Sequence, residues 1–242
     1  MPIKAVIFDL DGTIASFNLD YLTVRAEVRS YLIRSGLPAS ILATNESIFD
    51  MLKKAEIFLK NSGKSQRTFN KVRNEALSIA EKYEMEAAKT TEVLPGVAET
   101  LVTLKKMGLK IGLCTINSEK STNYILKRFS VAKFFDAVTP RNKVKFVKPN
   151  PEHLEATLKA LHASPKEAML VGDGSRDMRC ARELKVIAVG LPTGTNSQKE
   201  LTDSGANYVV TSIGDLPRLV QTINKRSRIR ARIKKKKPES SA

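Results

Sequence analysis

From residue 97 onward, short apolar runs alternate with stretches of helical periodicity, and this alternation limits the folds that the chain can adopt. Apolar runs of four to six residues between turn signals are typical of strands that are buried on both faces. Strands joined by helices form βαβ units, whose strands lie parallel in one sheet. The pattern predicts an α/β protein with a parallel sheet and strands at 109–114, 134–138, 168–171, 186–189 and 207–210.

One more strand and a long helical block precede this part of the chain. Residues 3–8 are almost entirely apolar and rich in β-branched side chains, as in a buried strand. From about 21 to 89 the apolar residues recur at helical spacing, with breaks at 35–38 and 61–63. We expect three or four helices inserted after the first strand. The expected layout is a core at 1–16 and 92–224, a helical insert at 17–91 and a basic, flexible tail at 225–242. Because Ile229 and Ile233 are four residues apart, the tail starts as a possible extension of the last helix.

The formal net charge of +16 is unevenly distributed along the chain. Nine Lys or Arg residues and a single acid lie in 225–242, so half of the excess charge belongs to that segment. A mildly basic body suits anionic substrates. A basic tail suits nucleic acid through phosphate neutralisation, or serves only solubility. The tail has no interleaved aromatic residues for base stacking, which makes nucleic acid a weak expectation.

The sequence argues against a disulfide-stabilised protein and against a membrane-spanning one. Cys114 and Cys180 are the only cysteines, so the chain has no disulfide framework, and both are expected to be small core residues. No apolar run approaches the roughly 20 residues that a bilayer crossing needs. The first strand begins almost at residue 1, with no leader pattern before it, so we expect a cytoplasmic protein.

Two carboxylates stand at the exit of the first predicted strand, in Asp9-Leu10-Asp11-Gly12. Because strand side chains alternate between faces, Asp9 and Asp11 lean the same way. Two like charges so close repel each other unless a cation or a shared proton lies between them. The pair therefore indicates a hard-cation site in which one carboxylate is free to act as a nucleophile. An ordinary strand followed by an Asp-Gly turn is the alternative.

Polar residues also follow other predicted strands. Thr115 follows 109–114, Asp173 and Asp177 follow 168–171, and Lys148 lies in a loop before the next predicted helix. In parallel sheets the ligand binds at the carboxyl ends of the strands. We therefore expect these residues to share one site with Asp9.

These residue types supply the parts that phosphoryl transfer needs. Asp9 is the candidate nucleophile, giving an aspartyl-phosphate that water then hydrolyses. Asp11 is the candidate acid that protonates the leaving oxygen and the base that later deprotonates water. The candidate phosphate-binding residues are Thr115, Ile116, Asn117 and Lys148.

The remaining acidic residues are candidates for a metal site. Asp9, Asp11 and Asp173 offer the oxygen ligands that Mg²⁺ prefers. Asp177 is expected either to complete the oxygen shell or to orient Lys148.

Four motifs, in order within residues 3–224, resemble those of the haloacid dehalogenase superfamily, and most nearly its phosphoglycolate phosphatase-like subgroup. They are Asp9-Leu10-Asp11-Gly12-Thr13, Thr115, Lys148-Pro149-Asn150-Pro151 and Gly172-Asp173-Gly174-x-x-Asp177. The resemblance implies a Rossmann-like three-layer core, a Mg²⁺ requirement and the roles given above. The helical insert resembles the family's C1 cap in position and helicity. Since the dehalogenases of the family lack the second aspartate, Asp11 argues against dehalogenation.

We therefore expect a Mg²⁺-dependent phosphatase that hydrolyses a small, phosphoglycolate-like metabolite, with the insert closing over the site on hinges near 14–20 and 88–94. Two departures from the subgroup leave the substrate open: Ser16-Phe17 replaces a frequent Asp-Ser pair, and Ile116 replaces a small or amide residue. A phosphomutase, which uses the same first two aspartates, is the rival within the family. A non-catalytic scaffold that binds nucleic acid through the basic tail is the rival outside it.

Four further residues are weighed between functional and structural roles. Arg25 and Arg29 are four residues apart on the first predicted helix of the insert, and so share one face. They are candidates for clamping a carboxylate or a second phosphate of the substrate, and a solvated face is the alternative. His153 and His162 are expected to have surface or capping roles.

Overall fold

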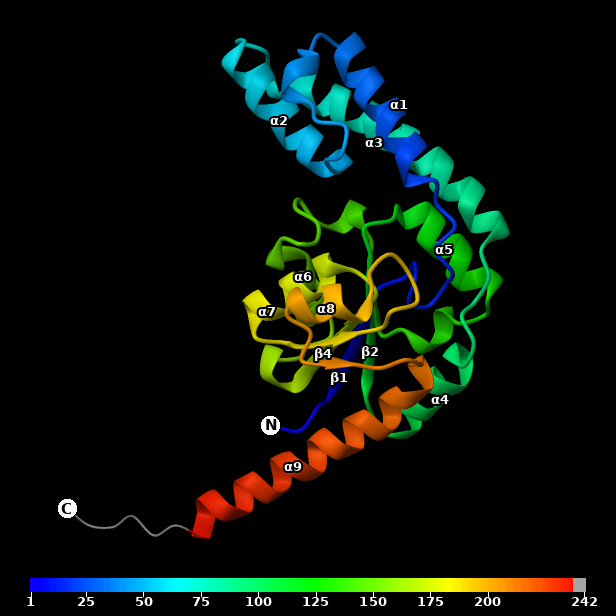
Figure 1. Ribbon diagram of the computed structural model, residues 1–242, viewed down its shortest axis with the longest axis vertical. Coiled ribbons are helices and arrows are strands. Elements are labelled where there is room, and N and C mark those ends of the chain that lie inside the picture. Colours follow the sequence, from blue (N-terminus) through cyan, green and yellow to red (C-terminus); the bar gives the residue numbers. More distant parts are fainter. Residues whose placement is uncertain (237–242) are drawn as a thin grey trace, which may run out of the picture. The chain divides into compact units, whose positions relative to one another are not determined.

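The computed structural model describes the backbone of residues 1–236 and the side chains of residues 1–229, and in this range six strands form one sheet (Figure 1). They are β1 (Ala5–Phe8), β2 (Lys110–Cys114), β3 (Ala137–Thr139), β4 (Ala168–Gly172), β5 (Ile187–Gly190) and β6 (Tyr208–Val209). All their pairings are parallel, in the spatial order β3-β2-β1-β4-β5-β6. The α/β fold with a parallel sheet that the sequence predicted is confirmed.

The register of β1 determines which residues of the neighbouring strands lie beside its carboxyl end. Phe8, the last residue of β1, lies opposite Leu113 of β2 and Val171 of β4. The strand order reverses at β1, because β2 and β3 are added on one side and β4, β5 and β6 on the other. Ligands of such sheets bind beyond the carboxyl ends of the strands at this switch point. Asp9, the residue after β1, emerges at that point.

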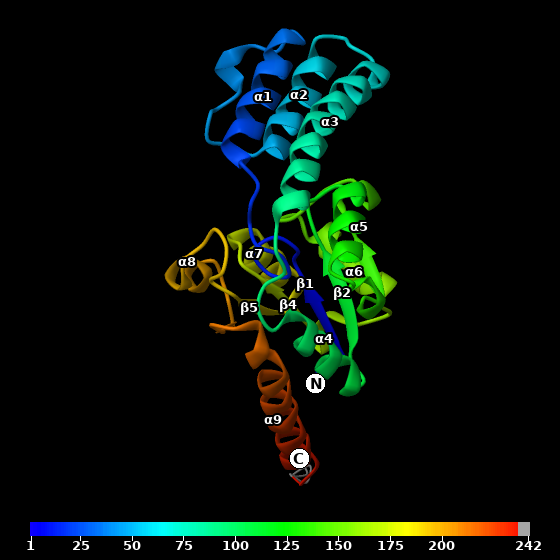
Figure 2. The ribbon, with the colours of Figure 1, turned by 90° about the vertical axis from the view of Figure 1, so that its right-hand side faces the viewer.

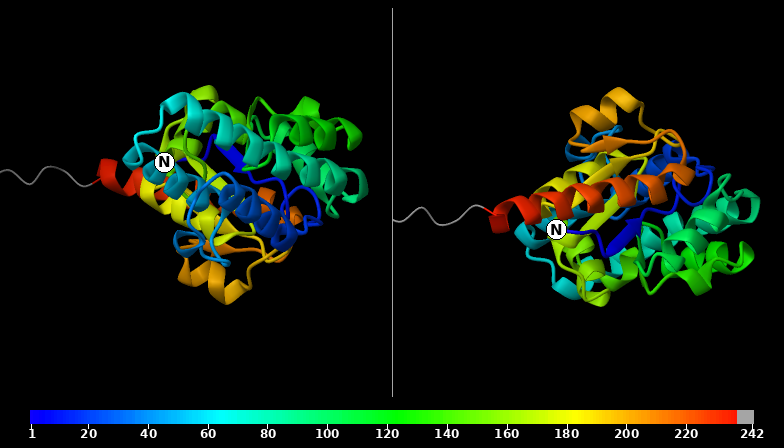
Figure 3. Two further views of the ribbon diagram at one scale, coloured as in Figure 1. Left: turned by 90° about the horizontal axis from the view of Figure 1, so that it is seen from above. Right: turned by 90° about the horizontal axis from the view of Figure 1, so that it is seen from below.

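Helices cover both faces of the sheet. They are α4 (Val97–Lys106), α5 (Glu119–Arg128), α6 (Pro151–Ala160), α7 (Ser175–Leu184), α8 (Gln198–Asp203) and α9 (Leu216–Lys236). On one face α6 and α7 pack against the strands, and Leu154 and Met178 join Ile7 and Leu170 in one buried cluster. On the other face α4 packs against β2 and α9. There α9 runs lengthwise across the core (Figure 3, right panel).

Residues 18–90 form a compact unit of their own, and residues 1–17 with 91 onward form the other unit. The first unit holds α1 (Tyr21–Arg34), α2 (Ile48–Asn61) and α3 (Gln66–Thr90), which lie side by side (Figure 2). Val28, Leu32, Met51 and Ala76 are completely buried there, so the unit has its own apolar core. It contains helices and no strand, as the periodicity of this segment predicted.

The two chain segments that enter and leave this helical insert run side by side. Ala15 and Val93 form an antiparallel bridge. The amide of Ser16 donates to the carbonyl of Glu92 at 2.8 Å, and the hydroxyls of Ser16 and Thr91 lie 3.0 Å apart. The two chain segments that lead into and out of the insert are therefore hydrogen-bonded to each other.

Among the strands whose bounds differ from the prediction, two differ for reasons that the hydrogen bonds show. The strand expected at 134–138 is a 3-10 turn at Ala132–Phe134 followed by β3, because the amides of Phe134 and Phe135 bond back to Val131 and Ala132. The strand expected at 207–210 is shortened to β6, since the side-chain oxygen of Asn207 takes the amide of Ala188 at 2.8 Å.

The last helix continues past 224, the expected boundary between core and tail, in line with the possible helix extension at the start of the tail. Helix α9 continues to Lys236, so most of the expected basic tail is helical, and residues 237–242 lie outside the described part. No helix among the described residues is both long enough and apolar enough to span a bilayer.

Candidate active site

The side chain of Lys148 joins two strand ends at the centre of the candidate site. Its ammonium lies 2.9 Å from Oδ1 of Asp9, after β1, and 2.6 Å from Oδ1 of Asp177, in the first turn of α7. The lysine and Asp177 are buried, whereas Asp9 keeps part of its surface open. Burial alone lowers the pKa of Lys148, but the charges of Asp177 and Asp9 outweigh it and raise the pKa well above the usual 10.5. Lys148 is therefore a fixed cation beside Asp9.

The loop that carries Lys148 is anchored by His153, for which the sequence predicted a surface or capping role. The surface alternative is wrong, because His153 is completely buried in α6. Its Nδ1 accepts the amide of Lys148 at 3.3 Å, and its Nε2 lies 2.9 Å from the carbonyl of Thr139 at the end of β3. These partners assign the proton to Nε2, which then donates to Thr139. Burial, helped by the charge of Lys148, lowers the pKa of His153 to about 4, so the ring is neutral.

Three carboxylates converge beside this lysine. Oxygens of Asp9, Asp173 and Asp177 all lie within 4.8 Å of one another. Burial and the charge of Asp9 raise the pKa of Asp173 to about 6. Burial, together with the charges of Asp9 and Asp173, raises the pKa of Asp177 to about 7, against the opposing effect of Lys148. One lysine does not balance three carboxylates, so the donor set fits a hard divalent cation.

The hydrogen bonds distinguish the two roles expected for Asp177. One of its oxygens holds Lys148, and the other accepts the amide of Gly174 at 3.3 Å. Both oxygens therefore have protein partners, which favours the orientation of Lys148 over direct metal binding. Asp173 is held differently, since its Oδ2 accepts the amide of Thr195 at 2.9 Å.

The residues after β2 meet Asp11. The side-chain amide of Asn117 donates to Oδ2 of Asp11 at 2.8 Å, and the amide of Asn117 donates to the hydroxyl of Thr115 at 3.2 Å. Thr115 and Asn117 are buried. Arg141, itself buried, fastens this loop by donating to the carbonyl of Ile116 at 3.2 Å. The side chain of Asn117 therefore ties this loop directly to Asp11.

The loop after β5, which the sequence did not assign to the site, packs against it. Thr193 donates its hydroxyl to the carbonyl of Gly12, and Thr195 holds Asp173. A Cβ on Gly194 would overlap the carboxylate of Asp173, so the backbone approaches that group more closely than any other residue allows. Its position in the sequence could have indicated this role, because this loop, like the others of the site, directly follows the carboxyl end of a strand.

Arg25 and Arg29 have partners within the helical insert. Arg29 donates to the carbonyls of Leu42 at 2.8 Å and Ala39 at 3.3 Å. The guanidinium of Arg25 lies 4.7 Å from the centre of the Tyr21 ring. These contacts favour a structural role for Arg29 in particular. His162 is exposed, as expected.

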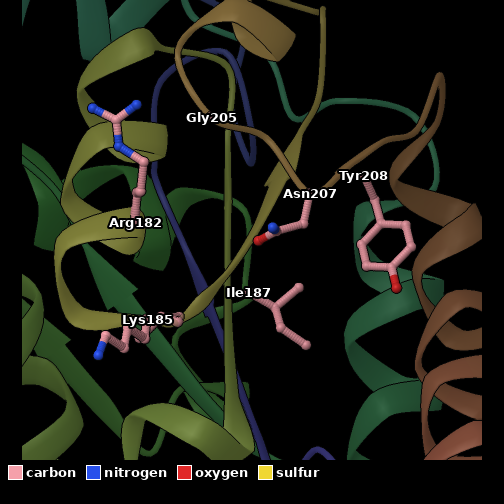
Figure 4. Close-up of a pocket in the computed structure, with 7 residues that line it drawn as sticks. Arg182, Lys185, Ile187, Gly205, Asn207 and Tyr208 are labelled. Carbon is pink, nitrogen blue, oxygen red and sulfur yellow. The ribbon is translucent and has the colours of Figure 1, made fainter.

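A separate hollow of about 360 Å³ lies at the opposite, amino edge of the sheet (Figure 4). It is lined by the end of α7 and the starts of β5 and β6, through Arg182, Lys185, Val186, Ile187, Gly205, Asn207 and Tyr208. Its lining contains no carboxylate and none of the candidate catalytic, phosphate-binding or metal-binding residues, so it is not part of the candidate active site.

The sequence is similar to a known protein family and to proteins of that family. Residues 6–191 match the family described as Haloacid dehalogenase-like hydrolase. The chain is 30% identical over 230 residues to the pyrophosphatase PpaX of Bacillus mycoides, an alignment that covers 93% of this chain and 100% of that protein.

Two solved structures share the fold. A predicted phosphoglycolate phosphatase from Haemophilus somnus has a TM-score of 0.59 at 21% identity, over 90% of this chain and 97% of that one. A beta-phosphoglucomutase from Clostridium difficile has a TM-score of 0.59 at 22% identity, over 94% and 99%. At these identities the likeness is one of fold alone.

Proposed function

Because the chain belongs to the haloacid dehalogenase-like hydrolases and is a phosphatase of that family, we propose that it hydrolyses a small phosphorylated metabolite through an aspartyl-phosphate on Asp9, with Mg²⁺ as cofactor. The observation that carries this proposal is the placement of Asp9. Its carboxylate is partly open, pairs with Lys148 at 2.9 Å, and lies within 4.8 Å of Asp173 and Asp177.

Asp9 is suited to nucleophilic attack by its surroundings. The ammonium of Lys148, 2.9 Å from Asp9, offers positive charge to the phosphoryl oxygens. An oxygen of Asp9 attacks phosphorus as the bond to the leaving oxygen breaks, which gives the aspartyl-phosphate. Water then attacks phosphorus and the bond to Asp9 breaks, which restores the carboxylate and releases inorganic phosphate.

Asp11 is the residue proposed to move the protons of both steps. It gives a proton to the leaving oxygen in the first step and takes one from water in the second. The side-chain amide of Asn117 donates to Oδ2 of Asp11 at 2.8 Å. The hydrogen bond fixes the orientation of the carboxyl group, so Asn117 acts as its positioning residue.

Mg²⁺ would be held by Asp9, Asp11 and Asp173, with Asp177 orienting Lys148. When bound, the ion neutralises charge on the phosphoryl oxygens and on the clustered carboxylates. Thr195 keeps Asp173 turned toward Asp9 through the bond to Oδ2. Thr115 and the backbone of the loop after β2 are the proposed phosphate ligands from the other side of Asp9.

The substrate is proposed to be a small, phosphoglycolate-like phosphomonoester, with pyrophosphate as the second candidate. The second candidate is favoured by the relative named pyrophosphatase PpaX, whose whole length aligns with this chain. Both compounds are small, carry more than one anionic group and suit a chain whose formal net charge is +16. The helical insert at residues 18–90 is proposed as the cap that selects between them. The protein is expected to act in the cytoplasm.

The decisive experiment is phosphate release from a panel of metabolites that includes phosphoglycolate and pyrophosphate, with Mg²⁺ present or chelated. Asp9→Asn should lower turnover of every substrate about a thousandfold or more. Asp203→Asn, which removes an exposed carboxylate on α8, is the matched control and should keep wild-type rates. Near-normal turnover by Asp9→Asn would remove the nucleophile assignment. Sugar-phosphate isomerisation without release of phosphate would favour the phosphomutase, and inactivity on the whole panel would favour the non-catalytic scaffold.

A further inference from the structure

Helix α9 carries an unusual distribution of charge. Its 21 residues, Leu216–Lys236, include nine Lys or Arg and no Asp or Glu. Leu216, Val220 and Ile223 are buried and lie on one face, which holds the first turns against the core. After Ile223 the sequence of the helix is dominated by cations. Packing therefore accounts for the first half of α9 but not for the composition of the second half.

The basic side chains that the structure describes on α9 form no ion pairs with the described part of the protein. Arg218, Lys225, Arg226 and Arg228 are all exposed, and none forms an ion pair with a described residue. Because like charges at helical spacing repel one another, this arrangement costs free energy in the isolated chain. A polyanion laid along the helix relieves that repulsion.

The helix is anchored at the edge of the sheet opposite the candidate active site. Asn224 accepts the amide of Ile3 at 2.6 Å, and Ser227 donates to the carbonyl of Met1 at 3.0 Å. These contacts lie before the start of β1, whereas Asp9 lies after its end. The last turns of α9 extend beyond the sheet and the helices that cover it (Figures 1 and 3). A ligand bound there leaves Asp9 accessible.

We propose that α9 binds the phosphate backbone of nucleic acid, without sequence preference, as a tether that leaves the active site open. Phosphate neutralisation by Lys and Arg supplies most of non-specific nucleic-acid affinity. Residues 216–236 contain no Phe, Tyr or Trp, so they offer no base stacking and no sequence readout. The proposal does not depend on the proposed substrate.

A membrane surface fits the helix less well than nucleic acid does. A helix that lies in a bilayer interface needs a continuous apolar face with large side chains. The apolar face of α9 is already buried in the core as far as Ile223, and Ile229 is the next apolar residue, 48% exposed. Apart from Ile229, the described exposed surface of the second half is polar or charged.

The test is fluorescence anisotropy of the full chain with a fluorescein-labelled oligouridylate, repeated with a labelled DNA duplex, between about 50 and 200 mM salt. The wild type should bind both with a dissociation constant of roughly 10⁻⁶ to 10⁻⁴ M that weakens steeply with salt. The binding variant carries five substitutions, Lys225→Gln, Arg226→Gln, Arg228→Gln, Lys234→Gln and Lys235→Gln. It should bind at least about tenfold more weakly. The slope of log K against log salt concentration should be flatter by about 3 or more, because each lost phosphate contact reduces that slope by about 0.7–0.9.

The control variant loses the same number of cations elsewhere. It carries Gln at the exposed positions 60, 64, 67, 71 and 89 of the helical insert and should bind within about threefold of wild type. The binding variant should hydrolyse an aryl phosphate at the wild-type rate, which separates tethering from catalysis. Equal weakening in both variants, or no binding by the wild type at low salt, would overturn the proposal. Binding to phosphatidylserine vesicles but not to oligonucleotides would overturn it in favour of a membrane surface.

Discussion

At the scale of single residues, the candidate site is a cluster of buried charge that is stable only as a whole. Lys148 lies between Asp9 and Asp177 at 2.9 and 2.6 Å, and removing one member of such a buried set leaves the others uncompensated. The neutral ring of His153 anchors the loop of Lys148 without adding a further positive charge. The site thus combines a fixed cation with carboxylates that remain able to bind a metal.

Burial of His153 as a neutral ring predicts a specific pH dependence of stability. Below its usual pKa of 6.5 the unfolded chain gains a proton on this ring, whereas the folded protein does not until pH falls to about 4. The stability that His153 contributes is therefore complete above pH 6.5 and is lost between pH 6.5 and about 4. This difference corresponds to about 3 kcal/mol of the free energy of unfolding.

Urea denaturation of the wild type and His153→Gln, at a series of pH values from 7 to about 4, checks this prediction. Gln stays neutral and can keep a donor and an acceptor in the ring's place. The variant should lose about 3 kcal/mol less than the wild type across that window. Parallel losses in the two proteins would show that His153 becomes protonated in the folded state.

At the scale of elements, close approach between loops positions the acidic residues. The turn after β1 and the loop after β5 enclose the carboxylate of Asp173 from two sides, through Gly12 and Gly194. Gly12 has φ +70°, and a Cβ there would lie 2.5 Å from Cγ of Asp173. The position of the Asp173 carboxylate thus depends on the absence of a side chain at Gly12, just after β1.

Gly12→Ala should therefore displace Asp173 and impair the metal site. We expect at least a tenfold loss of phosphatase activity and a higher Mg²⁺ concentration for half-maximal rate. Gly36→Ala is the control, because Gly36 also has positive φ, +96°, but nothing lies within 4 Å of its added Cβ. Both variants should lose about 1–2 kcal/mol of stability from backbone strain. If Gly36→Ala lost as much activity as Gly12→Ala, strain rather than displacement of Asp173 would explain the effect.

At the scale of the whole molecule, the helical insert and the sheet-containing unit have separate apolar cores. The cluster around Val28 and Met51 belongs to the insert, and the cluster around Ile7 and Leu170 belongs to the sheet. Because residues 16 and 92 are hydrogen-bonded at the junction, the ends left by removing 18–90 already lie side by side. The proposed catalytic residues all lie outside the insert.

Replacing residues 18–90 by a short Gly-Asn-Gly linker should therefore leave a folded protein that still hydrolyses an aryl phosphate, within about tenfold of the wild-type kcat. Its preference among phosphorylated metabolites should be much reduced, because the proposed cap is absent. Circular dichroism checks folding, and kcat/KM across the substrate panel checks selectivity. A folded variant with unchanged selectivity would mean that the insert is not the specificity element.

Much of the fold could be predicted from sequence because its signals are local. Alternating strand and helix patterns indicated the parallel sheet, and the position of Asp9, Thr115 and Asp173 after strands indicated a common edge. The burial of His153 could not be predicted, since it depends on how the loop of Lys148 folds back onto β3. The contact of Thr195 with Asp173 joins two loops 22 residues apart and has no local signature.

The central claim is that Asp9 carries the phosphoryl group and Asp11 moves the protons, and a pre-steady-state burst measured on Asp11→Asn tests it most directly. An aryl phosphate has a leaving group that needs little protonation, so this variant should still phosphorylate Asp9 but release phosphate slowly for lack of its base. We predict a burst of phenolate close to one equivalent of enzyme, followed by a slow steady rate, and no burst when Asp9→Asn is added. Linear product formation from time zero, or a burst that survives Asp9→Asn, would contradict the account.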